Sequence, residues 1–176
     1  MSLTVTENQS LKPFNSFGVA VRAARYAEAH SEADVREALA LAAANGWPLL
    51  PIGGGSNLLL TRDQQALVLR MALSGRRLLA DEGESVVVEA EAGEPWHAFV
   101  LWTLEQGLAG LENLSLIPGT VGAAPMQNIG AYGVEIKDVF AGLTALDRQS
   151  GELREFALED CAFGYRDSLF KRQGGR

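Results

Sequence analysis

Three consecutive glycines followed by serine and asparagine, Gly53-Gly54-Gly55-Ser56-Asn57, constrain this chain more than any other feature. They follow an apolar run, Trp47 to Ile52, that predicts a short buried strand. Each glycine loses more backbone freedom on folding than alanine would, at roughly 1 kcal/mol, so three together indicate a loop that approaches another group closely or adopts φ > 0. Their unhindered N–H groups can form a concave site for a phosphate oxygen, to which Ser56 and Asn57 add side-chain donors. The alternative is a tight turn at the strand exit, without a ligand.

The residues around this loop predict a β-α-β unit, with the loop at the exit of its second strand. Arg25–Ala29 is expected to be the first strand. Ser31 and Asp34 form a capping box that begins a helix, and Asn45-Gly46 ends the helix. Leu67–Met71 is expected to be a further strand.

The remainder of the chain predicts a second group of strands and a second helix. Val88–Ala92 alternates like a half-exposed strand, and a helix is expected to begin near Pro95 and to end at Gly107. Residues 139–146 and 152–156 predict a hairpin, so a wholly parallel sheet is not expected. The buried stripe of the second helix is predicted to consist of Trp96, Phe99, Val100 and Leu104.

We therefore expect an α+β protein with two small lobes, residues 19–74 and 75–176. Residues 1–18 form an N-terminal segment, and its first ten residues are polar and expected to be mobile.

A second glycine-rich segment spans residues 116–133, with four glycines, two prolines and almost no charge in eighteen residues. A solvated loop is normally polar, so this segment is expected to be covered. Small residues for close approach, the amides of Gln127 and Asn128, and the ring of Tyr132 suit a flat heteroaromatic ligand. The alternative is a compact Ω-loop that packs on its own protein. The two loops together favour a dinucleotide-like cofactor.

Several classes of protein are excluded or disfavoured. The sequence contains neither the phosphate-loop motif G-x-x-x-x-G-K-[ST] nor the Rossmann motif G-x-G-x-x-G. A net charge of −7 disfavours a nucleic-acid partner.

The single cysteine, Cys161, excludes an internal disulfide and a cysteine-rich zinc site, and its apolar surroundings predict a buried thiol. We expect no metal. The sequence has no signal-peptide pattern and no apolar run long enough for a membrane span, so we expect a cytoplasmic protein without a membrane partner.

Four segments taken together resemble one family of bacterial enzymes. They are Asn15-Ser16-Phe17-Gly18, the loop 53–57, the loop Ile117–Gly133, and Phe163-Gly164-Tyr165-Arg166-Asp167-Ser168. In this order and at these intervals, from about Leu11 to Lys171, they resemble the UDP-N-acetylenolpyruvoylglucosamine reductases, also called UDP-N-acetylmuramate dehydrogenases. The motif Gly-Tyr-Arg-Asp-Ser is similar to that of the type I branch.

The resemblance implies a vanillyl-alcohol-oxidase-type FAD-binding fold with two FAD-binding lobes. Its non-covalent FAD takes a hydride from NADPH and reduces the enolpyruvyl group of UDP-N-acetylglucosamine-enolpyruvate. The product, UDP-N-acetylmuramate, serves peptidoglycan synthesis, and through it cell-wall biogenesis, cell shape and cell division. By motif match, Gly53, Gly54, Gly55, Ser56 and Asn57 face the FAD diphosphate. The rest of the cofactor is enclosed by Pro118, Gly119, Thr120, Gly122, Gln127, Asn128, Ile129, Gly130 and Tyr132.

The resemblance also implies that Arg166 is a catalytic residue that binds the substrate carboxylate, with Tyr165 as a neighbouring substrate contact. A guanidinium binds a carboxylate bidentately and stabilises the negative charge that hydride addition leaves on it. The alternatives are an Arg166–Asp167 salt bridge or simple exposure, and a packing role for Tyr165. His97 is interpreted as a structural histidine beside its helix's apolar stripe, and His30 as a linker residue.

Family members continue beyond the segment matched here and carry a serine proton donor and a glutamate in a third, substrate domain. We therefore interpret this chain as an N-terminal piece that retains FAD binding and does not catalyse the reaction alone. The family implies a monomer, whereas an apolar face left uncovered in a shorter piece favours self-association. Two other hypotheses stay open: a non-catalytic flavin-binding module, and another oxidase of the same FAD superfamily.

Overall fold

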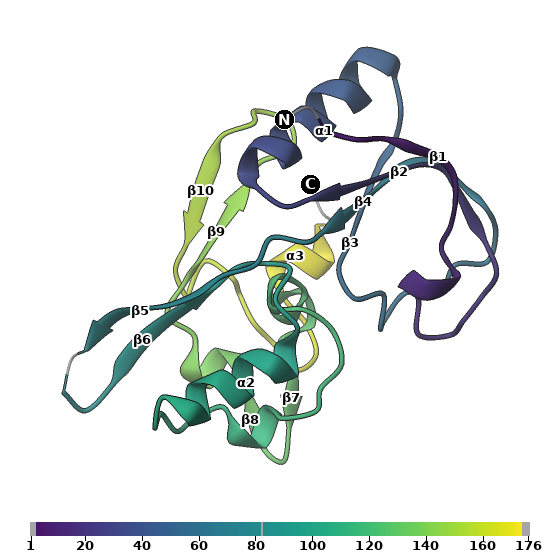
Figure 1. The fold of residues 1–176 in the computed structure, drawn as a ribbon. Helices are drawn as coiled ribbons and strands as arrows, with labels where there is room; N and C mark the ends of the chain where they lie inside the picture. The colour runs from purple at the N-terminus through teal and green to yellow at the C-terminus, as the bar shows by residue number, and fades with distance from the viewer. Residues whose placement is uncertain (1–2, 82, 174–176) are drawn as a thin grey trace. The chain divides into compact units, whose positions relative to one another are not determined.

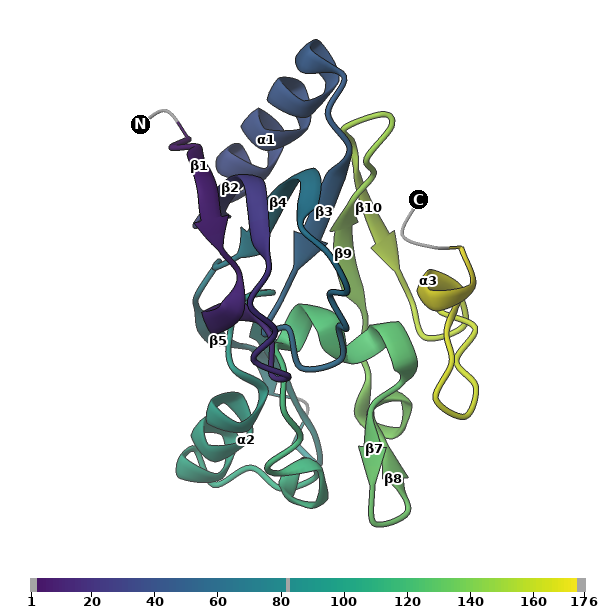
Figure 2. The same cartoon turned by 90° about the vertical axis from the view of Figure 1, so that its right-hand side faces the viewer.

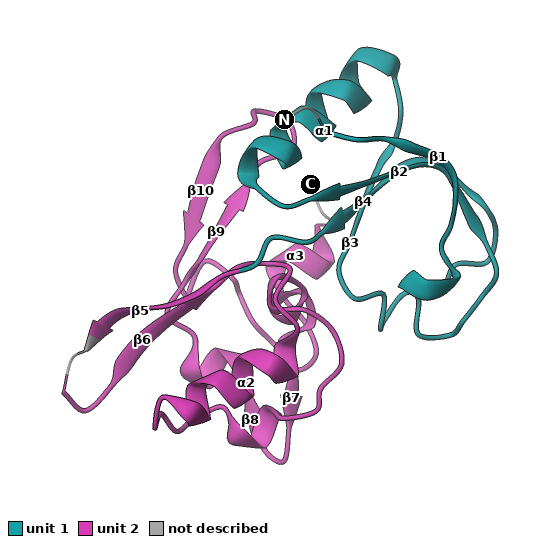
Figure 3. Ribbon diagram, in the orientation of Figure 1, with its two compact units in different colours: residues 1–74 teal, residues 75–176 magenta. Residues whose placement is uncertain are grey.

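A computed structural model describes residues 3–81 and 83–173 (Figure 1). The chain divides into two compact units, Met1–Ser74 and Gly75–Arg176 (Figure 3). Each unit has its own hydrophobic core and its own sheets, and each is described by itself.

The first unit is built on a four-stranded sheet with the order β1-β2-β4-β3. Its strands are β1 (Thr6–Ser10), β2 (Arg22–Ala29), β3 (Leu49–Ile52) and β4 (Gln64–Met71). β2, β4 and β3 are parallel, and β1 is antiparallel to β2. The predicted β-α-β unit is therefore present, but β4 lies between its two strands.

The expected mobility of the N-terminus is wrong for residues 6–10. They pair with β2, in a register that places Thr6 opposite Tyr26 and Ser10 opposite Arg22. Pairing with the edge of an existing sheet satisfies backbone groups whatever the polarity of the side chains, which explains why a polar pentapeptide forms a strand. Met1 and Ser2 lie outside the described residues. A short 3₁₀ helix, η1 (Lys12–Phe14), follows β1.

Helix α1 (Glu32–Asn45) begins and ends where its capping residues predict. The Ser31 side chain accepts a hydrogen bond from Asp34 N, and Gly46 adopts φ +64° just after the last helical residue. The helix covers one face of the sheet (Figure 2). Its small residues Ala38 and Ala42 pack against the buried side chains of β2 and β4 on that face.

In the described residues of the second unit, the strands form three two-stranded hairpins instead of one larger sheet. They are β5 (Arg76–Asp81) with β6 (Val86–Ala90), β7 (Gly130–Ala131) with β8 (Val134–Glu135), and β9 (Leu143–Leu146) with β10 (Leu153–Phe156). The 3₁₀ helices are η2 (Glu112–Leu114), η3 (Val121–Gln127) and η4 (Ile136–Val139), and α3 is Leu169–Arg172. The predicted C-terminal hairpin is confirmed as β9–β10, but its first strand begins at Leu143 and not at residue 139, which is the last residue of η4. The β5 strand was not predicted.

Helix α2 (Trp96–Glu105) contributes Trp96, Phe99 and Val100 to the second unit's core. Trp96, Phe99 and Val100 are buried as predicted, but Leu104 is 42% exposed. Thr103 is buried in its place, because its hydroxyl donates to the Val100 carbonyl oxygen at 2.8 Å and so carries no unsatisfied polar group into the core. Among the described residues no helix is long and apolar enough to cross a membrane.

Candidate functional site

The first glycine loop leaves β3 after Ile52 and turns back onto the backbone of the first unit. Gly55 adopts φ +65°, and a Cβ at this position would overlap the carbonyl oxygen of Phe14 and lie 2.8 Å from its carbon. Ser16 N donates to the Gly55 carbonyl oxygen at 3.1 Å. Gly55 is therefore required by close packing on its own chain, whereas Gly54 and Asn57 are exposed and Gly53 and Ser56 half-buried.

Asn15 holds the segment against which Gly55 packs. Its side-chain amide donates to the carbonyl oxygens of Leu11 at 2.8 Å and Val19 at 3.1 Å, and its oxygen accepts from Val19 N at 2.9 Å. The residue is 6% exposed. The sequence placed Asn15 only within the family motif, and no local signal predicted that its side chain orders this segment.

The second glycine loop begins by lying along residues 92–96. Trp96 N donates to the Gly119 carbonyl oxygen at 3.0 Å, and Gly122 N donates to the Ala92 carbonyl oxygen at 2.9 Å. A Cβ on Gly122 would come within 2.6 Å of the Ala92 Cβ. The glycine at 122 thus permits a close backbone approach within the protein. Pro118 and Gly122 are exposed, and Gly119 and Thr120 are half-buried.

The expected cofactor residues in the second half of this loop range from buried to exposed. Gln127, at the end of η3, is half-buried, Ile129 belongs to the core at 7% exposure, and Gly130 is buried in β7. Tyr132 and Gly133 form the two-residue tip of the β7–β8 hairpin with φ of +52° and +82°, as a type I′ turn requires. The ring of Tyr132 is 88% exposed there.

Three side chains tie this loop to the arginine motif, 36 to 42 residues further along the chain. Asn128 Nδ2 donates to the Gly164 carbonyl oxygen at 2.9 Å, and its oxygen accepts from Lys137 N at 3.2 Å. Arg166 Nη2 donates to the Gly130 carbonyl oxygen. Ser168 Oγ donates to the Met126 carbonyl oxygen at 2.6 Å. The two motifs singled out in the sequence are therefore one connected structure in the second unit.

Arg166 itself lies at the tip of a tight turn. Gly164 N and Asp167 N each donate to the other residue's carbonyl oxygen, at 3.0 and 3.2 Å, which closes the turn on both sides. Arg166 adopts φ +53°, a conformation that costs a non-glycine residue energy and is concentrated at functional sites. Its guanidinium carbon lies 5.7 Å from the Tyr165 ring, which is 85% exposed.

The alternative reading of Arg166, a salt bridge to Asp167, does not match the observed pairing. Asp167 pairs with Arg172, and Lys171 Nζ donates to the Arg166 carbonyl oxygen at 2.8 Å. The Arg166 guanidinium instead points back to the second glycine loop through Gly130.

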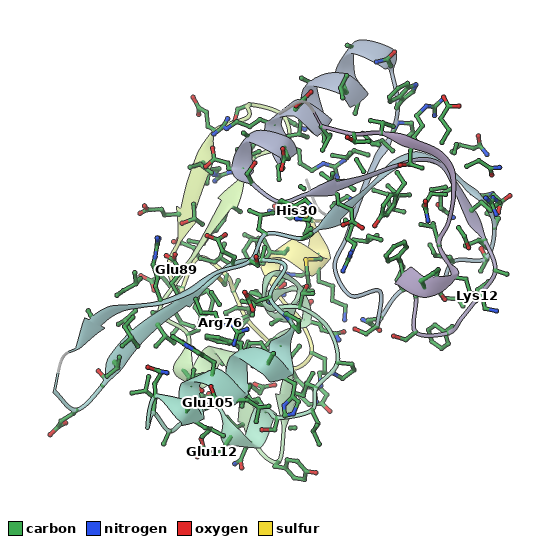
Figure 4. The ribbon with its side chains drawn as sticks, viewed as in Figure 1. Lys12, His30, Arg76, Glu89, Glu105 and Glu112 are labelled. Atoms are coloured by element: carbon green, nitrogen blue, oxygen red, sulfur yellow. The ribbon has the colours of Figure 1, made fainter. Side chains whose placement is uncertain are left out.

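The other titratable residues considered in the sequence are His97, His30 and Cys161. His97 Nδ1 accepts from Leu116 N at 3.2 Å in a half-buried position, as predicted for a structural histidine. His30 is exposed and follows β2 (Figure 4). Cys161 is fully buried, and this burial, with Asp160 and Glu159 nearby, raises the pKa of its thiol. Within residues 3–81 and 83–173, no group of three or more histidine, cysteine or acidic side chains is arranged to hold a metal.

Comparison with known proteins assigns the chain to a class of flavoproteins. The family described as "FAD binding domain" matches residues 23–157, and the chain belongs to this family. FAD is therefore its cofactor, as the sequence predicted.

The chain is 75% identical to the UDP-N-acetylenolpyruvoylglucosamine reductase of Pseudomonas fluorescens Pf-5, over all 176 residues and 52% of that protein. It is 71% identical to the enzyme of Pseudomonas aeruginosa, over the same share, and 54% identical to that of Azoarcus sp., over 51% of its length. The chain thus spans about half the length of the curated relatives it matches.

Solved structures agree on the fold. The reductase of Thermus caldophilus has a TM-score of 0.71 at 24% identity, over 94% of this chain and 56% of that one. The 6-hydroxy-D-nicotine oxidase of Arthrobacter nicotinovorans has a TM-score of 0.67 at 20% identity, over 91% and 37%. The predicted vanillyl-alcohol-oxidase-type FAD-binding fold is confirmed.

Proposed function

We propose that this chain is the FAD-binding part of an NADPH-dependent reductase. The reaction converts UDP-N-acetylglucosamine-enolpyruvate to UDP-N-acetylmuramate in the cytoplasm, for peptidoglycan synthesis. The observation that carries this proposal is 75% identity, over all 176 residues, to a UDP-N-acetylenolpyruvoylglucosamine reductase. The matched region includes both glycine loops and the arginine turn.

We propose that each unit contributes to FAD binding. Loop 53–57 contacts the diphosphate through its backbone N–H groups, and Gly54 and Asn57 are exposed as this role requires. Gly119, Thr120, Gln127 and Tyr132 line the flavin. Asn128, Ile129 and Gly130 are buried in the described structure, so we assign them the role of shaping the loop instead of touching the cofactor.

When bound, FAD supplies hydride transfer between NADPH and the enolpyruvyl double bond. Arg166 binds the substrate carboxylate through its guanidinium and stabilises the negative charge that develops there when the β-carbon is reduced. Its hydrogen bond to the Gly130 carbonyl oxygen and the closed turn 164–167 hold the guanidinium in one orientation. Tyr165 contacts the substrate beside it.

Binding of FAD is tested on this chain. The protein is mixed with FAD and desalted, and the visible flavin absorbance is measured. Stoichiometric flavin absorbance supports the proposal, and its absence contradicts it.

The reductase activity is tested on a full-length protein that contains this sequence, by substrate-dependent NADPH oxidation. We expect Arg166→Lys to lower kcat/KM by about a hundredfold or more, because a lysine cannot bind a carboxylate bidentately in this geometry. The control Arg154→Lys changes an exposed arginine of β10 and is expected to leave activity unchanged. Oxidation of NADPH that does not depend on the substrate, or an unaffected Arg166→Lys variant, contradicts the assignment.

A further inference from the structure

The glycine loop 53–57 leaves the first unit's sheet close to two charged residues, Glu28 and Arg70. β2, β4 and β3 are parallel, so their carboxyl ends lie at one edge, and the loop follows the carboxyl end of β3. In the observed register, Arg70 of β4 lies between Glu28 of β2 and Ile52 of β3. Side chains at paired positions point to the same face of a sheet. Glu28 and Arg70 therefore lie on the same face as Ile52, the residue just before the loop.

A polar network joins three side chains on that face. The hydroxyl of Tyr26 donates to Glu28 Oε1 at 2.5 Å, and Arg70 Nη1 donates to the same oxygen at 3.0 Å. Tyr26 is 5% exposed, whereas the side chains of Glu28 and Arg70 are 30% and 40% exposed. The hydrogen bond from Tyr26 and the charge of Arg70 lower the pKa of Glu28, which therefore remains ionised near neutral pH. On the other side, Glu28 Oε2 lies 3.6 Å from His30 Nε2.

Phe14 connects this network to the glycine loop. Its ring stacks on that of Tyr26, with centroids 5.1 Å apart, and the guanidinium carbon of Arg70 lies 5.3 Å from its centroid. The backbone of the same residue occupies the space that a side chain on Gly55 would need. Two residues later, Ser16 N donates to the Gly55 carbonyl oxygen. One aromatic residue is thus in contact with the network through its ring and with the loop through its backbone.

We propose that Tyr26, Glu28 and Arg70 are positioning residues for the FAD diphosphate. They hold the Phe14 ring, and the backbone from Phe14 to Ser16 in turn holds Gly55 in the φ +65° conformation that directs the loop. The proposal rests on the proposed function, because it requires loop 53–57 to hold the diphosphate. None of the three residues lies in a glycine-rich or arginine motif, and none needs to touch the cofactor.

The physical reason is preorganisation. A run of three glycines samples many conformations, and ordering it upon binding lowers the affinity for the ligand. A loop that is already fixed by packing has less conformational freedom to lose. Breaking the network of Tyr26, Glu28 and Arg70 therefore raises the Kd for FAD even when the protein stays folded.

Two variants remove polar links while keeping the shape of the network. Tyr26→Phe keeps the ring that stacks on Phe14 and removes the hydroxyl, and Glu28→Gln keeps the length of the side chain and removes the charge. The matched control is Arg36→Gln on α1. Its ion pair with Glu32 at 2.6 Å is 43% and 49% exposed, close to the exposure of the Arg70–Glu28 pair, and α1 packs on the other face of the sheet.

The affinity of each variant chain for FAD is measured by quenching of flavin fluorescence, at a temperature where its far-UV circular dichroism shows it to be folded. The two phosphorus signals of bound FAD are recorded by ³¹P NMR, which reports the environment of the diphosphate directly. We expect Tyr26→Phe and Glu28→Gln each to raise the Kd about tenfold and to shift the phosphorus signals. The flavin absorption bands stay unchanged, and Arg36→Gln behaves like the wild type. The double variant is expected to lose little more than either single variant, because both break the same network.

The outcomes separate this inference from the proposed function. A wild-type chain that binds no FAD contradicts the proposed function. A wild-type chain that binds FAD, with both variants at wild-type Kd and unchanged phosphorus signals, overturns the positioning role and leaves the function standing. Lower thermal stability with an unchanged Kd also overturns it, since the network would then be only structural.

Discussion

Asn128 and Arg166 both adopt left-handed backbone conformations, with φ of +45° and +53°, in the two segments that the structure ties together. Asparagine tolerates this conformation better than most residues, whereas arginine does not. The turn at Arg166 is held nonetheless, because side-chain hydrogen bonds fix it on both sides. Asn128 donates to the carbonyl oxygen of Gly164, before Arg166, and Ser168, after Arg166, donates to the carbonyl oxygen of Met126. Strain of this kind persists only where the surroundings fix the conformation.

Asn128→Ala tests how much the tie between loop and turn contributes. The substitution removes a fully buried side chain and leaves the Gly164 carbonyl oxygen and the Lys137 N–H, which belong to half-buried residues, without their side-chain partners. We expect a loss of about 2–4 kcal/mol in the free energy of unfolding, measured by urea denaturation. Asn113→Ala, at an exposed asparagine of η2, is the control and should change stability little. A loss confined to a few tenths of a kcal/mol would show that the tie is not structural.

The glycines at 55 and 18 allow packing to be separated from backbone conformation. Their φ angles are nearly equal, +65° and +62°, but only Gly55 faces an obstacle, the backbone of Phe14; nothing lies within 4 Å of a Cβ on Gly18. Gly18→Ala should therefore cost about 1 kcal/mol, from the φ > 0 conformation alone. Gly55→Ala should cost at least about 1–3 kcal/mol more, because the 14–16 backbone has to move. Urea denaturation of the two variants gives the comparison, and equal losses would contradict the packing role.

At the scale of secondary structure, the sequence predicted the ends of helices but not the order in which strands pair. The ends of α1 followed from Ser31, Asp34 and Gly46, since capping depends on neighbours in sequence. The position of β4 between β2 and β3 did not, because it depends on pairing partners up to 42 residues apart. The same limit explains β1, whose polar sequence carries no strand signal without its partner strand.

The candidate site shows a similar division. The glycine content marked both loops, but the sequence could not show that Gly55 and Gly122 are needed for contacts with their own chain. It could not show either that Asn128 points into the protein, or that Tyr26 and Arg70 meet at Phe14. The family resemblance identified Arg166; its hydrogen bond to Gly130 came only from the fold.

The N-terminus of α1 makes a prediction about pH. Hydrogen bonds from the backbone N–H of His30, from the Ser31 side chain and from the Ser31 backbone lower the pKa of Asp34. Because the folded pKa lies below the unfolded value, near 3.9, the stabilisation is present above that value and is lost as the pH falls through the folded pKa. The free energy of unfolding of wild type and Asp34→Asn is measured between pH 5.5 and pH 3. We expect the advantage of the wild type to shrink as the pH falls, and an advantage that stays constant or grows would contradict this account.

At the scale of the whole chain, the family match at residues 23–157 extends across both compact units. The first unit contains loop 53–57, and the second contains loop 116–133 together with the arginine turn. Each unit has a buried core that can hold its own loop: Tyr26, Ile52 and Val68 lie in the first, and Trp96, Leu114 and Ile129 in the second. A cofactor with a diphosphate and a flavin ring offers each loop a different chemical group. FAD is therefore expected to stabilise both units and not one alone.

Hydrogen–deuterium exchange with and without FAD tests this expectation on the chain as it stands. At a free FAD concentration of about 100 times its Kd, binding adds about 2.7 kcal/mol to the stability of whatever it binds. Slower exchange is expected in peptides that cover residues 53–57 and in peptides that cover residues 119–132.

The buried thiol of Cys161 gives a second readout for the second unit, since its alkylation requires opening of that unit and should slow on addition of FAD. Riboflavin, which lacks the diphosphate, is the control ligand and should protect the first loop least. Protection of only one unit by FAD would show that the other does not take part in binding, because a ligand stabilises only the state and the segments that it contacts or orders.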